Sequence, residues 1–121
     1  MSFLLIKLSK KKYCFLIDIE LPEPPLVKLE KDKFFIRIQN VGETVYHLNF
    51  LCIPLNKKVE VSLNIYSRIL KRGDSVNGEG EIRFKEPGKT SLELVLEFID
   101  ENYQKIVLRK KISFKTFILP K

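Results

Sequence analysis

One histidine and two cysteines are the side chains of this sequence best suited to chemistry near neutral pH. Catalysis of the nucleophilic or acid–base kind needs a nucleophile, a base and an orienting group that converge in a pocket, and a single histidine supplies little for one. His47 is out of phase with the apolar Leu48 and Phe50, so it is predicted at the surface or rim. Cys52 lies five residues further on, in the opposite strand phase, which argues against a catalytic pair or a shared metal. The sequence predicts no catalytic residue and no enzyme. A small hydrolase with a pocket around His47 is the weaker alternative.

Residues 74–81, Asp-Ser-Val-Asn-Gly-Glu-Gly-Glu, gather oxygen ligands in a predicted mobile loop. Calcium therefore has to be considered, although the spacing differs from that of an EF-hand loop. Neither a glycine-rich phosphate loop nor an HExxH or paired-carboxylate motif is present in the sequence. We expect no cofactor, no metal and no small-molecule substrate.

The basic residues are the stronger functional signal, because 22 lysines and arginines against 15 acidic residues give a net charge of +7. Four of them share one face of the last long strand-like segment: Lys105, Arg109, Lys111 and Lys115. Such a stripe could bind the phosphates of a nucleic acid. Lysines on an outer or edge strand also oppose aggregation, and the neighbouring Glu93 and Glu97 would neutralise part of the stripe.

The first 21 residues carry apolar side chains on both faces of a predicted β-hairpin. A two-stranded ribbon of this composition is not stable alone and must cover something. It either closes one sheet of its own domain or adds its edge to a protein partner or a second copy of the chain. The candidate partner-binding side chains are Phe3, Leu5, Phe15 and Ile17.

Apolar and polar residues alternate with a period of two along most of the chain, which is the pattern of half-buried strands. The alternation is clearest in residues 90–100 and 105–115, and the Asp-Glu-Asn-Tyr stretch that joins them suits a hairpin turn. These two segments are predicted to pair antiparallel. Five further body strands are predicted at residues 26–30, 33–40, 44–52, 59–65 and 81–85.

A chain of 121 residues is expected to form one domain, residues 1–121, around one core. It divides into an N-terminal hairpin (1–21), a proline-rich connector (22–25) and a sandwich (26–121). The predicted fold is all-β: an immunoglobulin-like antiparallel β-sandwich of about seven strands with an extra N-terminal β-hairpin.

Nothing in the sequence has the pattern of a signal peptide or of a membrane span of about 20 apolar residues, so we expect a cytoplasmic protein. Cys14 and Cys52 are then expected to be buried thiols, with a disulfide between them as the alternative. Richness in Lys, Glu and Ile is compatible with a thermophilic source.

Three turn motifs follow one another along the chain: Asn40-Val41-Gly42, Leu-Lys-Arg-Gly-Asp-Ser at residues 70–75, and Pro87-Gly88. The last motif precedes a predicted strand that ends in Phe98-Ile99-Asp100. In this order the chain resembles the immunoglobulin-like domains of archaeal and bacterial surface and adhesion proteins, including the CARDB type. The resemblance covers residues 34–114, about two thirds of the chain. It implies a sandwich that serves as a spacer or as a protein-binding or carbohydrate-associated module.

We therefore expect a non-catalytic protein–protein interaction module or accessory subunit that could self-associate through its sheet edges, with another protein or a second copy as partner. The alternative is a nucleic-acid-binding accessory protein that uses the basic face of the last strand.

Overall fold

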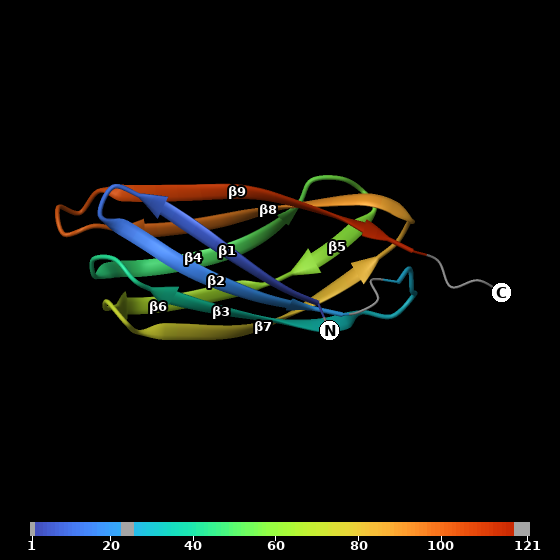
Figure 1. The fold of residues 1–121 in the computed structure, drawn as a ribbon, viewed down its shortest axis with the longest axis horizontal. Coiled ribbons are helices and arrows are strands. Elements are labelled where there is room, and N and C mark those ends of the chain that lie inside the picture. Colours follow the sequence, from blue (N-terminus) through green and yellow to red (C-terminus); the bar gives the residue numbers. More distant parts are fainter. Residues whose placement is uncertain (1, 23–25, 118–121) are drawn as a thin grey trace.

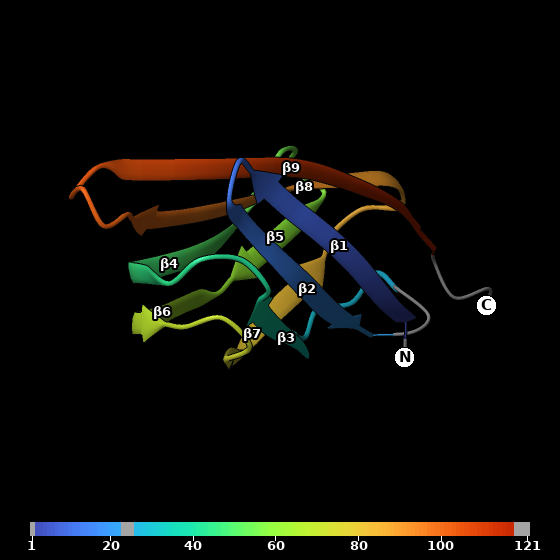
Figure 2. The same ribbon diagram turned by 60° about the vertical axis from the view of Figure 1, so that its left-hand side comes forward.

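The structure, a computed structural model, describes residues 2–22 and 26–117, and for residues 2 and 3 the backbone alone. This part of the chain contains nine strands: β1 (Ser2–Lys10), β2 (Tyr13–Leu21), β3 (Asp32–Asn40), β4 (Val45–Pro54), β5 (Val59–Ser62), β6 (Asn64–Leu70), β7 (Ser75–Phe84), β8 (Gly88–Ile99) and β9 (Lys105–Thr116). They form a five-stranded sheet in the order β1-β2-β3-β7-β5 and a four-stranded sheet in the order β6-β4-β8-β9. The two antiparallel sheets pack face to face (Figure 1 and Figure 2). The predicted fold, an all-β immunoglobulin-like sandwich, is confirmed.

The core lies between the sheets and receives alternate side chains from strands of both. Five phenylalanines are among its largest fully buried side chains: Phe15, Phe34, Phe50, Phe84 and Phe98. The ring of Phe98 on β8 lies 4.9 Å from the ring of Tyr13 and 5.4 Å from that of Phe15, both on β2. Such contacts between the sheets bury large apolar areas, which is the main favourable contribution to folding.

The N-terminal hairpin belongs to the sandwich. β2 pairs with β3 in a register that runs from Phe15 opposite Asn40 to Glu20 opposite Phe35. The hairpin therefore supplies two of the five strands of its sheet, and the division into a hairpin and a sandwich that begins at residue 26 does not describe the architecture. Of the proline-rich connector 22–25, residues 23–25 lie outside the described part of the chain.

Two predicted strands are wrong. Residues 26–30 form no strand; Leu26 and Val27 make isolated bridges to Phe117 and Phe84, so this segment links the ends of the two sheets. Residues 59–65 form parts of two strands, because the chain leaves the five-stranded sheet after β5 and joins the other sheet as β6. Leu63, between them, is buried at this crossing, and the uninterrupted alternation of the sequence gave no sign of it.

The expected mobile loop at residues 74–81 is also wrong, because most of it belongs to β7. The glycines that suggested a loop face the opposite sheet. A Cβ on Gly78 would collide with the side chain of Ile65, and one on Gly80 would lie 2.6 Å from the ring of Phe34. Gly78 therefore leaves room for Ile65 of the opposite sheet, and Gly80 leaves room for the ring of Phe34 on the neighbouring strand of its own sheet.

Four connections meet at one end of the sandwich, on the left in Figure 1, which we call the turn end: β1–β2, β3–β4, β6–β7 and β8–β9. The buried side chain of Asn40 stands at its centre. Its Nδ2 donates to the carbonyl oxygens of Glu43 and Leu70, each at 2.8 Å, and its Oδ1 accepts from the amide of Gly42 at 2.9 Å. One side chain thus joins the β3–β4 turn to the end of β6.

The backbone of Asn40 continues this network into the β6–β7 turn. Its amide donates to the carbonyl of Asp74 at 3.0 Å, and its carbonyl accepts from the amide of Gly73 at 2.6 Å. On the other side, Gly42 packs against the β1–β2 turn so closely that a Cβ would lie 2.5 Å from the carbonyl oxygen of Lys12. The Asn40-Val41-Gly42 turn is therefore in direct contact both with the turn at residues 70–75 and with the β1–β2 turn.

The replacement of Asn40 by alanine should be among the most destabilising polar substitutions in the chain. It leaves two carbonyls and an amide at the turn end without their partner, so we expect the free energy of unfolding to fall by about 2–4 kcal/mol. The matched control is Asn77→Ala, the same chemical change at an exposed position of β7, with an expected loss below about 0.5 kcal/mol. Urea unfolding followed by circular dichroism measures both; equal losses would contradict the central role of Asn40.

Candidate functional site

The four basic residues predicted to share a face do so, on the outer face of the four-stranded sheet, and all four are exposed. Two of them are ion-paired with β8: Lys105 Nζ lies 3.3 Å from Glu97 Oε2, and Arg109 Nη1 lies 2.7 Å from Glu93 Oε1. The Nζ of Lys115 lies 5.5 Å from the centre of the Phe117 ring. Within the described part of the chain, Lys111 and Lys115 form no ion pair. The stripe is thus half neutralised by its neighbouring strand.

The net charge of the chain is nevertheless concentrated around this strand. Residues 2–12 and 88–117, which contain β1, β8, β9 and the turns after β1 and β8, hold ten basic and four acidic side chains, so they carry six of the seven net positive charges. β1 and β9 are the edge strands on the same side of the two sheets (Figure 2). An anionic partner would therefore be steered toward this side of the sandwich.

Of the four predicted partner-binding side chains the structure describes three, and these three do not share a surface. Phe15 and Ile17 are 0% exposed, because β2 lies between β1 and β3 and these residues point into the core. Their assignment as surface contacts is wrong; apolar residues on both faces of the hairpin had concealed which face is the inner one. Leu5, on the outer face of β1, is 69% exposed. The side chain of Phe3 lies outside the described part of the structure.

In the part of the chain that the structure describes, no strand pairs with the outer edge of β1. A two-residue turn, with Lys11 at a φ of 54°, makes Lys10 and Tyr13 the closing pair of the hairpin. Hydrogen-bonded and non-bonded pairs alternate from there, so the even-numbered residues of β1 bond to β2. The amide and carbonyl groups of Leu5, Lys7 and Ser9 consequently point to the free edge, on the far side from β2.

Along β9, too, residues alternate between bonding to the neighbouring strand and pointing to the outer edge. Asp100 closes the β8–β9 loop: its amide donates to the carbonyl of Gln104 at 3.0 Å, and its Oδ1 accepts from the amides of Asn102 and Gln104, each at 2.9 Å. From that pair onward, the even-numbered residues of β9 bond to β8 and the odd-numbered ones face outward. Phe117 confirms the parity, because its carbonyl accepts from the amide of Val27 on this outer side at 3.0 Å.

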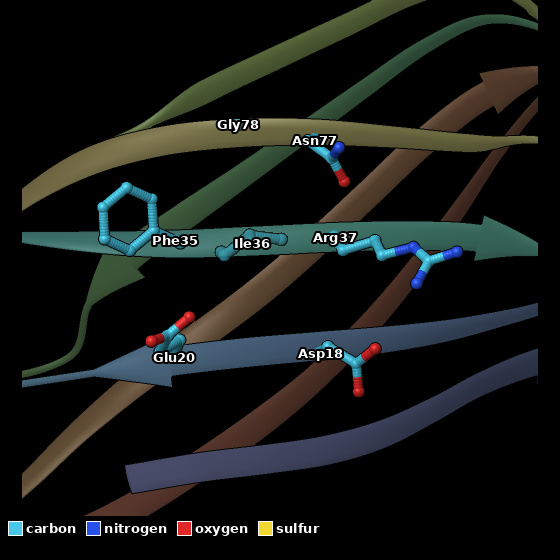
Figure 3. A pocket seen from close by; sticks show the side chains of 7 residues that line it. All are labelled: Asp18, Glu20, Phe35, Ile36, Arg37, Asn77 and Gly78. Carbon is cyan, nitrogen blue, oxygen red and sulfur yellow. The ribbon is translucent and has the colours of Figure 1, made fainter. Parts of the chain in front are cut away.

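A hollow of about 550 Å³ lies on the outer face of the five-stranded sheet (Figure 3). In register across the strands, Leu5 stands opposite Asp18, Asp18 opposite Arg37, and Glu20 opposite Phe35. The guanidinium of Arg37 donates to Ser75 Oγ, at 3.2 and 3.3 Å. The face is open and carries both signs of charge, and through Leu5 it continues to the free edge of β1. The seven residues that line the hollow are Asp18, Glu20, Phe35, Ile36, Arg37, Asn77 and Gly78.

His47 is exposed, as its phase predicted, at an irregularity of β4 where its φ is 49°. It borders a hollow of about 420 Å³ that Asp100 and Glu101 also line. The polar groups of this hollow are engaged elsewhere: His47 Nδ1 lies 2.8 Å from Tyr66 Oη, and Glu101 Oε1 accepts from Lys12 Nζ at 2.7 Å. Asp100 caps its own loop. The histidine and the two carboxylates therefore do not form a relay.

Both cysteines are free thiols on different sheets. Burial raises the pKa of Cys52 to about 12, whereas Cys14 is partly exposed on β2. Within residues 2–22 and 26–117, no three His, Cys, Asp or Glu side chains are grouped as a metal site would need. In that same part of the chain, no helix has the length and apolarity that crossing a membrane requires.

Two solved structures have a similar fold over almost their whole length. One is the GAE domain of GGA2p from Saccharomyces cerevisiae, with a TM-score of 0.60 and 13% sequence identity over 98% of this chain and 98% of that chain. The other is AvmM, which catalyses macrocyclization in alchivemycin A biosynthesis, with a TM-score of 0.56 and 12% identity over 96% of this chain and 97% of that chain. No protein-family model matches the sequence, and neither does any curated protein.

These likenesses define the class of the protein, an immunoglobulin-like β-sandwich, and at such low identity they show the fold alone. One of the two neighbours is an enzyme, so the architecture by itself does not select a function. The resemblance to CARDB-type domains was right about the sandwich, and membership of that family stays a prediction.

The two thiols should differ sharply in reactivity. At pH 8 the high pKa and the burial of Cys52 keep it from thiol reagents such as DTNB, so we expect one thiol per native chain to react, and two in guanidinium chloride. A Cys14→Ser variant should then show almost no reaction in the native state. Rapid modification of that variant would contradict the burial of Cys52.

Proposed function

We propose that this chain is a non-catalytic protein-interaction module that associates with a second copy of itself through the free edge of β1. The observation that supports it is a strand whose outward main-chain groups have no strand partner among the described residues and whose inner row is apolar from Leu4 to Leu8. Leu4, Ile6 and Leu8 form that row, with Ile6 and Leu8 buried. An unprotected edge of this kind is a template for another strand.

The exposed Leu5 suggests the register of the pairing. Antiparallel pairing of β1 with its copy, centred on Leu5, places the two leucines against each other and keeps the two Lys7 side chains apart. The five-stranded sheets of the two copies then continue as one. Asp18 and Arg37 are the next residues in the row of Leu5, so they would lie on the outer face of this continuous sheet, on either side of the two leucines.

The absence of an enzymatic role is part of the proposal. It is supported by the engagement of His47 with Tyr66 and of Glu101 with Lys12, which leaves no base oriented toward a nucleophile in the hollow beside β4.

Self-association at β1 should protect a specific set of amides. In dilute protein, the amides of Leu5, Lys7 and Ser9 should exchange quickly with solvent while those of Ile6 and Leu8 are slow; at high concentration all five should be slow. Hydrogen exchange followed by NMR from about 10 μM to 1 mM, with sedimentation velocity, measures this. A monomer at every concentration, with unchanged exchange, would refute the proposal.

A pair of variants isolates the role of the main chain in that association. Lys7→Pro removes an outward amide and leaves the ladder to β2 intact, whereas Lys7→Thr removes the charge and keeps the amide. We expect the dimer dissociation constant to rise at least about tenfold for Lys7→Pro and to change little for Lys7→Thr. Equal effects would mean that the side chain and not the edge mediates contact.

Nucleic-acid binding is the second candidate, favoured by the concentration of positive charge around β9. Labelled single- and double-stranded oligonucleotides titrated at about 50 and 200 mM salt test it by fluorescence anisotropy. Binding that falls steeply with salt and is lost in a variant with alanine at Lys105, Arg109 and Lys111 would support this function. The same variant should leave association through β1 unchanged.

A further inference from the structure

We infer that the free edge of β9, from Arg109 to Lys115, binds an extended segment of a partner protein in which acidic and apolar residues alternate. The segment adds to the four-stranded sheet as a further strand. This inference goes beyond self-association at β1 and concerns the other edge on this side of the sandwich.

Among the described residues, no strand pairs with the outer edge of β9 over this stretch. Arg109, Lys111 and Ser113 are odd-numbered, so their amide and carbonyl groups point away from β8. At the turn end β1 lies beside β9, but the two strands diverge toward the C-terminal half of β9 (Figure 1 and Figure 2). At Phe117, the chain already places one of its own amides, that of Val27, on this same edge.

Lys110 shows that the side of the sandwich is open at this level. Even-numbered side chains of β9 point toward the inner face, so Lys110 lies in the inner row. Its neighbours in that row are Leu108, which is 6% exposed, and the partly buried Ile112. The lysine itself is exposed. Pairing with an identical edge is disfavoured, since in any register two copies would bring eight basic side chains, those of Arg109, Lys110, Lys111 and Lys115 from each copy, into one strand pair. A second copy is therefore disfavoured here, in contrast to β1.

Charge complementarity defines the side chains that suit the edge. The outer row presents Arg109, Lys111 and Lys115, of which Arg109 alone is ion-paired within the described part of the chain. Acidic residues in the outer row of the added strand would face them. In the inner row, an acidic residue fits Lys110 and apolar residues fit beside Ile112 and Phe114, which already pack against the core.

A protein segment fits these features better than a nucleic acid does. Phosphates would use the lysines but leave the amide and carbonyl groups of the edge without partners, and Glu93 and Glu97 stand on the same outer face. The aromatic side chain in residues 109–115 is Phe114, whose ring packs edge-on against Phe84 at 5.5 Å and is not free to stack on bases.

The test uses a labelled nine-residue peptide in which Glu and Val alternate, compared with a peptide of the same composition whose glutamates are contiguous and with an oligonucleotide of similar charge. Anisotropy should show the alternating peptide binding at least about tenfold more tightly than the block peptide. On binding, the amides of Arg109, Lys111 and Ser113 should become protected from exchange, while those of Lys110 and Ile112 are protected from the start.

Ser113 offers a matched pair of variants without a change in charge. Ser113→Pro removes the outward amide and Ser113→Ala keeps it, and both lose the contact with Ser91 Oγ at 2.9 Å. Affinity for the alternating peptide should fall at least about tenfold in the first and stay within about twofold in the second. Circular dichroism and thermal melting verify the fold, and the exchange experiment on the unchanged protein stands if Ser113→Pro does not fold.

Two results would overturn the inference. One is equal affinity for the alternating peptide, the block peptide and the oligonucleotide with no new amide protection, which would mean purely electrostatic contact with a polyanion. The other is no binding of the alternating peptide at about 50 mM salt. Neither result bears on the dimer of β1, whose exchange pattern is measured without peptide.

Discussion

The buried amide of Asn40 is the interaction on which the geometry of this sandwich depends. It satisfies two carbonyls and one amide that would otherwise be buried without partners, and its backbone bonds to the β6–β7 turn as well. These bonds hold the end of β3, in one sheet, against the end of β6, in the other. Gly42 then brings the β1–β2 turn against the same point, so the end of edge strand β1 is fixed there.

The two edges differ although they lie side by side at the turn end. Both expose odd-numbered main-chain groups, and the difference is in the inner row. In β1 this row is apolar from Leu4 to Leu8 with Lys10 at its end, whereas in β9 it is interrupted by Lys110 between Leu108 and Ile112. An apolar row tolerates its own copy, whereas a lysine in the inner row demands a partner of opposite charge. Lys110 is thus the main difference between the two edges on which the proposed choice of partners rests. The ion pairs of Glu93 and Glu97 reduce the charge of the outer face but leave the edge itself basic.

Local patterns in the sequence predicted what depends on local chemistry. The alternation in β8 and β9, the Asn40 turn and the Asp100 loop were all foreseeable, because side-chain phase and capping act over a few residues. The inward glycines of β7 were misread as a loop, since they leave room for side chains distant in sequence: Ile65 at Gly78 and Phe34 at Gly80. The crossing at Leu63 and the inner face of β2 likewise depend on partners distant in sequence. The exposure of Lys110 could not be predicted from the sequence, because it depends on how β1 and β9 diverge in the fold.

The strand order has a kinetic consequence. β3 pairs with β7 and β4 with β8, so each sheet is completed by strands that lie far apart in the sequence, and the hairpin at the N-terminus joins its sheet through β3. Chain entropy is lost when these long loops close, before the contacts of the core form and offset that loss. Such a topology is therefore typical of the slower two-state folders, with folding times of milliseconds to seconds. During that interval β1, with its apolar inner row, is an unpaired edge open to other chains. The many lysines of the adjoining turn and of β9 then slow intermolecular encounters while the chain completes its sheets.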